Sequence, residues 1–115
     1  MKVSDLVDDL GLDVYCGKKG LDRAIKGGYT SDLLSDVMGN AKEGQVWITL
    51  QTHKNVAAIA SLKDLAAVIL VKSNLPDEDT ANHSNEENVP VLGTEHNAFE
   101  ITGIIYEKLK EHEVV

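Results

Sequence analysis

Two stretches, Val46-Trp47-Ile48-Thr49-Leu50 and Ala67-Val68-Ile69-Leu70-Val71, decide the fold of this 115-residue chain. Both are nearly continuous apolar runs of strand length. The segment between them, Asn55 to Leu65, is rich in Ala and Leu, which is typical of a helix. A strand, a helix and a strand in this order, with both strands apolar on both faces, predict a parallel pair whose sheet is covered by helices.

The same pattern extends in both directions along the chain. Upstream we expect a helix over Val3 to Leu10 that ends at Gly11, strands over Leu12 to Cys16 and Ile25 to Tyr29, and a short helix over Ser31 to Ala41 capped by Ser31 or Asp32. Downstream we expect a polar helix that opens at Pro76, a strand over Val89 to Leu92 whose Pro90 suits a strand start or a sheet edge, and a final helix capped by Asn97. The prediction is an α/β fold: one small domain over residues 1–115, of two or three layers, with a mostly parallel sheet of about four or five strands flanked by helices.

Charge and cysteine content limit the partners. The net charge is −8, from 11 Lys and Arg against 19 Asp and Glu. Such a surface repels phosphate backbones and anionic lipids, so we expect neither nucleic acid nor membrane as a partner. The single Cys16 cannot form an internal disulfide, and acidic Asp5 lies where a secretion signal needs an apolar run. We therefore expect a cytoplasmic protein.

Motifs that carry chemistry are absent from the sequence. No glycine-rich phosphate loop, dinucleotide fingerprint, nucleophile elbow or His-Glu-x-x-His zinc motif occurs. The histidines lie without metal-ligand spacing at positions 53, 83, 96 and 112. We therefore expect no enzyme, no metal and no cofactor. A minor alternative is an enzyme that uses Asp32 or His53 as an acid–base group.

One candidate site follows from the predicted topology. In an open parallel sheet, ligands bind outside the carboxyl ends of the strands, where the loops into the following helices meet. Here every such loop is polar, although loops that meet water are commonly polar without being sites. The predicted ligand-binding residues are Thr30, Ser31, Asp32, Thr49, Gln51, His53, Asn55, Lys72, Ser73, Thr94, Glu95 and His96.

The order of short apolar blocks resembles the DRTGG domain family. The blocks are Gly44 to Thr49, Ala67 to Leu70, Pro76, and Asn88-Val89-Pro90-Val91-Leu92-Gly93-Thr94. They cover about residues 20 to 110 and are also similar to the N-terminal domain of bacterial HPr kinase/phosphorylase and, more distantly, of the Mur ligases. Members of the family occur beside phosphate acetyltransferase and CBS modules, so the resemblance implies a bacterial sensing or scaffolding module without a kinase domain.

The residues that name the family are not retained. The Asp-Arg pair aligns with Thr52 and His53, and the Thr-Gly-Gly triplet aligns with Val71, Lys72 and Ser73. Whatever those residues bind in relatives, this chain cannot bind in the same way.

Two functions remain open. The first is a non-catalytic regulatory module that binds a small polar metabolite at the carboxyl ends of the strands. The second is a protein–protein interaction or oligomerisation module without a small-molecule ligand, in which a sheet edge or an apolar helix face pairs with a partner or with a second copy as a homodimer.

Overall fold

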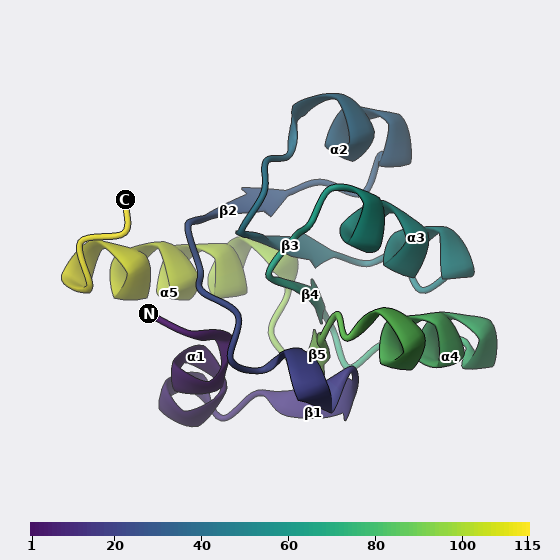
Figure 1. Cartoon of the computed structure of the whole chain (residues 1–115). Helices are drawn as coiled ribbons and strands as arrows, with labels where there is room; N and C mark the ends of the chain where they lie inside the picture. Colours follow the sequence, from purple (N-terminus) through teal and green to yellow (C-terminus); the bar gives the residue numbers. More distant parts are fainter.

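A computed structural model describes all of residues 1–115 as five strands and five α-helices. In chain order the elements are α1 (Val3–Leu10), β1 (Asp13–Cys16), a 3₁₀ turn (Lys18–Gly20), β2 (Gly27–Thr30), α2 (Leu34–Asn40), β3 (Gln45–Thr49), α3 (Lys54–Leu62), β4 (Ala67–Leu70), α4 (Glu78–Glu87), β5 (Val91–Gly93) and α5 (Ala98–Glu111) (Figure 1).

The strands form one sheet in the order β1-β5-β4-β3-β2. Strands β2 to β5 run parallel, with Trp47 opposite Tyr29 on one side and Val68 on the other. β1 is antiparallel to β5 and places Asp13 opposite Gly93. The prediction of a mostly parallel sheet flanked by helices is confirmed.

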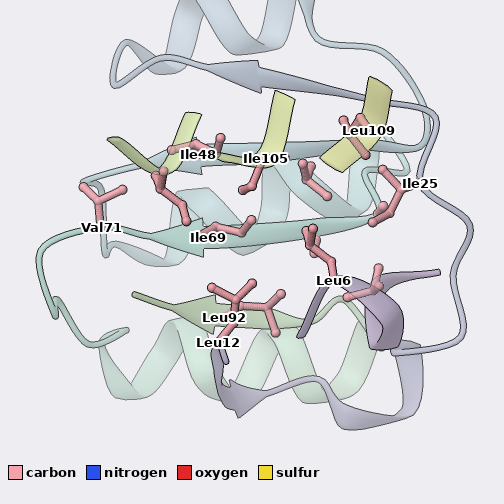
Figure 2. Packing of buried hydrophobic residues seen from close by; sticks show 14 residues of the cluster. Leu6, Leu12, Ile25, Ile48, Ile69, Val71, Leu92, Ile105 and Leu109 are labelled. Carbon is pink, nitrogen blue, oxygen red and sulfur yellow. The ribbon is translucent and has the colours of Figure 1, made fainter. Parts of the chain in front are cut away.

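Helices cover both faces of the sheet, which gives three layers. On one face α1 and α5 enclose a core that includes Leu6, Ile48, Ile69 and Ile105 (Figure 2). On the other face α2, α3 and α4 pack over the alternate residues of the same strands, among them Trp47. Burial on both faces explains why Val46 to Ile48 in β3 and all of β4 are apolar.

The helix ends follow the sequence signals at two of the predicted sites. Asn97 accepts a hydrogen bond from the Glu100 N–H at 2.9 Å, and the Glu100 carboxylate accepts one from the Asn97 N–H at 3.3 Å. Gly11 ends α1 in the left-handed conformation, with φ +64°. Both predictions are confirmed.

The predicted cap of α2 is wrong. The helix begins at Leu34 and its N-cap is Leu33, so neither Ser31 nor Asp32 caps it. Ser31 Oγ instead accepts from the Leu33 N–H at 3.2 Å. The Asp32 carboxylate accepts from the Leu50 N–H, just after the end of β3. The short side chains bond to nearby turn and strand-end groups in preference to the helix.

Several further boundaries differ from the prediction, among them the start of α4, which lies at Glu78 rather than at Pro76. β2 begins at Gly27 rather than at Ile25. α3 ends at Leu62 rather than at Leu65, and Asp64 has φ +56°, which no helix continues. β5 lies inside the sheet and not at an edge, and it begins after Pro90 rather than at Val89. Because Pro90 precedes the strand, its missing N–H removes no hydrogen bond from the sheet. The Pro90 carbonyl still accepts from the Val68 N–H.

The only tryptophan and the only cysteine of the chain are both buried. Trp47 is fully buried, and its indole N–H donates to the Ser31 carbonyl at 2.8 Å. Cys16 is also buried, and burial raises the pKa of its thiol. None of the helices has the length and apolar character needed to cross a membrane.

Candidate functional site

The carboxyl ends of β2, β3, β4 and β5 lie at one edge of the sheet, because these strands are parallel. We call this edge, with the loops that leave it, the rim. All twelve predicted site residues belong to it: they end these strands, lie in the loops that follow, or, as with Asn55, begin a helix. The beginning of antiparallel β1 also reaches the rim, next to Gly93.

The loops after β2 and β3 are joined through one carboxylate. Asp32 Oδ1 accepts from the Thr49 hydroxyl at 2.9 Å and from the Leu50 N–H at 2.7 Å. The Gln51 side-chain amide donates to the Asp32 carbonyl at 3.0 Å. Thr49 is buried and its hydroxyl also accepts from the Gln51 N–H at 3.2 Å, so it shapes the rim from below.

The loop after β3 is also fixed to the start of α4. The Thr52 carbonyl accepts from the Asp77 N–H at 3.1 Å and from the Thr80 hydroxyl at 2.8 Å. His53 Nδ1 lies 3.6 Å from Asp77 Oδ2, and both side chains are largely exposed. The imidazole therefore remains on the open surface of the rim, at the start of α3.

The turn after β4 is bound to the loop after β5. The N–H of Lys72 donates to the His96 carbonyl, and the N–H of Ser73 donates to the Thr94 carbonyl, each at 2.9 Å. Lys72 and Ser73 both have φ +57°, in the left-handed region that favours glycine. These are the two positions that align with the glycines of Thr-Gly-Gly in the resemblance described above, and their backbone has a conformation that glycine adopts readily.

Two hollows at opposite ends of the rim take up part of the predicted set. One, of about 250 Å³, is lined by Leu10, Gly11, Asp13, Ser73, Gly93, Thr94, Glu95 and His96. The other, of about 680 Å³, lies against the first half of α5, and Thr30 is the predicted residue that lines it. Gln51, His53, Asn55 and Lys72 lie between these ends, and the last three are exposed.

A second polar cluster lies on the α2 side of β2. The Tyr29 hydroxyl donates to Asp36 Oδ2 at 2.8 Å, and the Asn40 amide donates to Asp36 Oδ1 at 3.0 Å. Hydrogen bonds from Ser31, Tyr29 and Asn40 hold the pKa of Asp36 below its ordinary value. The bond to Asp36, followed by burial, raises the pKa of Tyr29. Asp32 and Asp36 therefore have separate partners and do not form a carboxylate pair.

Sequence reasoning missed four residues at the smaller hollow: Gly93, which ends β5, and Leu10, Gly11 and Asp13. The last three reach the rim only because β1 runs against the other strands, and no local pattern in Asp13 to Cys16 distinguishes an antiparallel from a parallel strand. The structure brings together no group of three or more His, Cys, Asp or Glu side chains able to hold a metal ion.

Comparison with known proteins gives a likeness of fold. No family model and no curated protein matches the sequence. Among solved structures, the chain is similar to the CBS and DRTGG domains of the regulatory region of Clostridium perfringens pyrophosphatase, complexed with its activator, diadenosine tetraphosphate. The TM-score is 0.71 at 14% sequence identity, over 90% of this chain and 45% of that one, so the chain spans about half the length of its neighbour. The fold of this chain is therefore similar to that of part of this DRTGG- and CBS-containing structure.

Proposed function

We propose that this chain is a non-catalytic regulatory module that binds a small polar metabolite at the rim. The observation that carries the proposal is the mutual bonding of the rim loops. Each loop is tied by hydrogen bonds to a neighbour: Asp32 to Thr49, Lys72 to His96, and Ser73 to Thr94. A site held in place in this way binds without the cost of ordering its loops.

The groups left open at the rim favour a ligand with both negative and neutral polar parts. Lys72 and His53 offer cationic or donor groups on the exposed side. The smaller hollow offers the carboxylates of Asp13 and Glu95 and the hydroxyl of Ser73, which suit hydroxyl or amino groups. The hydrogen bonds from Thr49 and Leu50 both go to Asp32 Oδ1, so Asp32 Oδ2 offers the ligand a further acceptor.

The solved neighbour supports a regulatory role. Its structure is that of a regulatory region in complex with an activator nucleotide. We extend this by proposal to the present chain as residues 1–115 of a single DRTGG-like domain, and we take a nucleotide as the first ligand class to test. The finer resemblance to HPr kinase/phosphorylase and the cytoplasmic location remain predictions.

A thermal-shift screen with mononucleotides and dinucleoside polyphosphates, including diadenosine tetraphosphate, tests the proposal. A ligand at about 100 times its Kd stabilises the folded state by about 2.7 kcal/mol. For a domain of this size, such a gain raises Tm by on the order of 10 °C. The double variant Lys72→Ala with His53→Ala should lose most of this shift.

A matched control comes from the opposite edge of the sheet. Lys19 and His112 are exposed, and Lys19 follows the end of antiparallel β1 while His112 follows the end of α5. The double variant Lys19→Ala with His112→Ala removes the same side-chain types and should keep the full shift. If no polar metabolite raises Tm, or if both double variants lose the shift equally, the rim is not the binding site.

A specific observation also favours the interaction module as a second candidate. Phe99 is 90% exposed on α5, and Tyr106, two turns further along, is 57% exposed. Large aromatic side chains are costly to leave in water and are common in protein interfaces. This function and ligand binding at the rim do not exclude each other, because the two surfaces are different.

A further inference from the structure

The outward face of α5 carries two exposed aromatic residues with a glycine between them. Phe99 lies four residues before Gly103, and Tyr106 lies three residues after it, so all three share one face of the helix. They line the hollow of about 680 Å³ together with Thr30 and Thr102. A second hollow of about 320 Å³ continues from Thr102 and Tyr106 along β2 at the sheet edge.

No contact within the chain requires a glycine at position 103. A Cβ added there would meet no atom within 4 Å, and the residue lacks the positive φ that calls for glycine. Glycine in a helix interior weakens the helix relative to alanine. At Gly17 and Gly20, in contrast, an added Cβ would overlap the backbone of the segment before β5. The bare backbone at Gly103 therefore suits a surface outside the chain that approaches closely.

The edge strand shows the same feature. An added Cβ at Gly28 would lie 3.6 Å from Val46 Cγ2, which is ordinary contact, and Gly28 has no positive φ. Glycine inside a strand often marks close approach by another backbone. Gly28 lines the hollow between β2 and α5, so two glycines that the chain does not need border the same surface.

From these features we infer that α5 of one copy packs antiparallel against α5 of a second copy, around a two-fold axis beside Thr102 and Gly103. Phe99 and Tyr106 lie at nearly equal distances, about 5 Å along the helix, on either side of that point. An antiparallel pair thus brings Phe99 of each copy to the level of Tyr106 of the other, with both rings over the backbone at Gly103. The surface is its own complement, as a two-fold interface requires.

The charges at the two ends of α5 fit the same pairing. Glu95 and Glu100 lie at its beginning, and Lys110 lies near its end, where it makes no ion pair within the chain. Of the other charges near that end, Lys108 pairs with Glu111, and Glu107 lines the hollow at the level of Ala98 of the second copy. Antiparallel packing places the Lys110 end of each copy beside the Glu95–Glu100 end of the other. It also places the positive N-terminal end of each helix dipole beside the negative C-terminal end of the other, which is favourable.

The test is the mass of the full chain by sedimentation equilibrium, for the wild type and for two glycine variants. The wild type should sediment at twice its 12.5 kDa mass at micromolar concentration. Gly103→Gln fills the hollow and should weaken dimerisation at least tenfold. Gly39→Gln is the matched control, because Gly39 is also helical, exposed and free of atoms within 4 Å of an added Cβ, but lies on α2. Gly39→Gln should dimerise like the wild type.

A crosslink gives a readout that does not depend on affinity. In Gly103→Cys the two new thiols lie beside the axis, so mild oxidation should link the dimer quickly, while Gly39→Cys should link at most slowly; native Cys16 is buried in both. A wild type that remains monomeric up to millimolar concentration overturns the inference. A dimer that Gly103→Gln leaves unchanged, or equal crosslinking of both cysteine variants, also overturns it.

Discussion

The hydroxyl of Thr49, at the end of β3, donates to the carboxylate of Asp32 at 2.9 Å across the space between two strand ends. The same carboxylate oxygen accepts the N–H of Leu50 at 2.7 Å. Asp32 thus supplies the acceptor for the Leu50 N–H that a neighbouring strand would otherwise supply. The first loop of the rim is fixed to the second by this residue.

Asp32→Ala should therefore destabilise the fold. The substitution leaves a buried threonine hydroxyl and one N–H without their acceptor, at a cost of about 1 to 2 kcal/mol in the free energy of unfolding. Asp32→Asn keeps an acceptor oxygen and should recover at least half of the loss. Urea denaturation of the three proteins measures this difference. Equal stabilities for Asp32→Ala and the wild type would mean that the carboxylate does not fix the loop.

Replacement of Lys72 or Ser73 by glycine should stabilise the protein. Both residues have φ +57°, and the left-handed conformation costs about 1 to 2 kcal/mol for a residue with a side chain. After the greater chain entropy of glycine is subtracted, we expect each variant to gain about 0.5 kcal/mol. If the Lys72 side chain also contacts the ligand, Lys72→Gly raises Tm without ligand and reduces the shift on ligand addition. If Lys72→Gly were less stable than the wild type, the left-handed conformation at Lys72 would not be a source of strain.

Stability at low pH should depend on Asp36. Its pKa is lowered in the folded state by hydrogen bonds from Ser31, Tyr29 and Asn40. A carboxyl with a lowered folded pKa contributes stability above its unfolded pKa, about 3.9, and loses it as pH falls through the lower folded value. Asp36→Asn should therefore flatten the dependence of the urea midpoint on pH below about pH 5. An unchanged slope in this variant would exclude Asp36 as a source of the acid sensitivity.

Stability at high pH should depend on Tyr29, with the opposite sign. Its pKa is raised, first by its hydrogen bond to Asp36, so its contribution is complete below the unfolded pKa of about 10 and is lost as pH rises through the folded value. Tyr29→Phe removes the group that titrates. The variant should lose less stability than the wild type between about pH 9 and pH 11, as measured by the same urea midpoints.

Two glycines in unlike surroundings should respond in opposite directions to alanine. Gly17 has φ +71°, and an added Cβ would overlap the Val89 carbonyl, so Gly17→Ala should cost about 3 kcal/mol. Gly39 lies in α2 with open space around it, so Gly39→Ala should gain about 0.5 to 1 kcal/mol. Circular dichroism melts of both variants check the signs. A tolerated Gly17→Ala would show that the turn after β1 is not packed against the segment before β5.

The sequence predicted the fold best where the pattern was strongest. Nearly continuous apolar runs at β3 and β4 indicated strands buried on both faces, and Asn97 indicated the start of α5. The prediction that Ser31 or Asp32 caps α2 failed because Asp32 accepts the Leu50 N–H after β3. That hydrogen bond depends on a contact between two loops, which no local sequence pattern encodes.

The rim could be predicted only in outline. Parallel strands imply one edge for all carboxyl ends, and the polar residues after each strand follow from it. The direction of β1 and the left-handed turn at Lys72 and Ser73 could not be derived from the sequence, because both are set by tertiary pairing. The outward face of α5 has a weak signal: Phe99 lies off the apolar stripe of Ile101, Ile105 and Leu109.

Binding at the rim is tested most directly by backbone amide chemical shifts of the ¹⁵N-labelled chain during titration with the nucleotide panel, diadenosine tetraphosphate included. A ligand at the rim should shift the amides of Gln51, Lys72, Ser73 and Thr94 to His96 most strongly and leave those of Lys18 to Gly20, at the opposite edge, unchanged. Shifts confined to that opposite edge, or no shifts with any member of the panel, would contradict it.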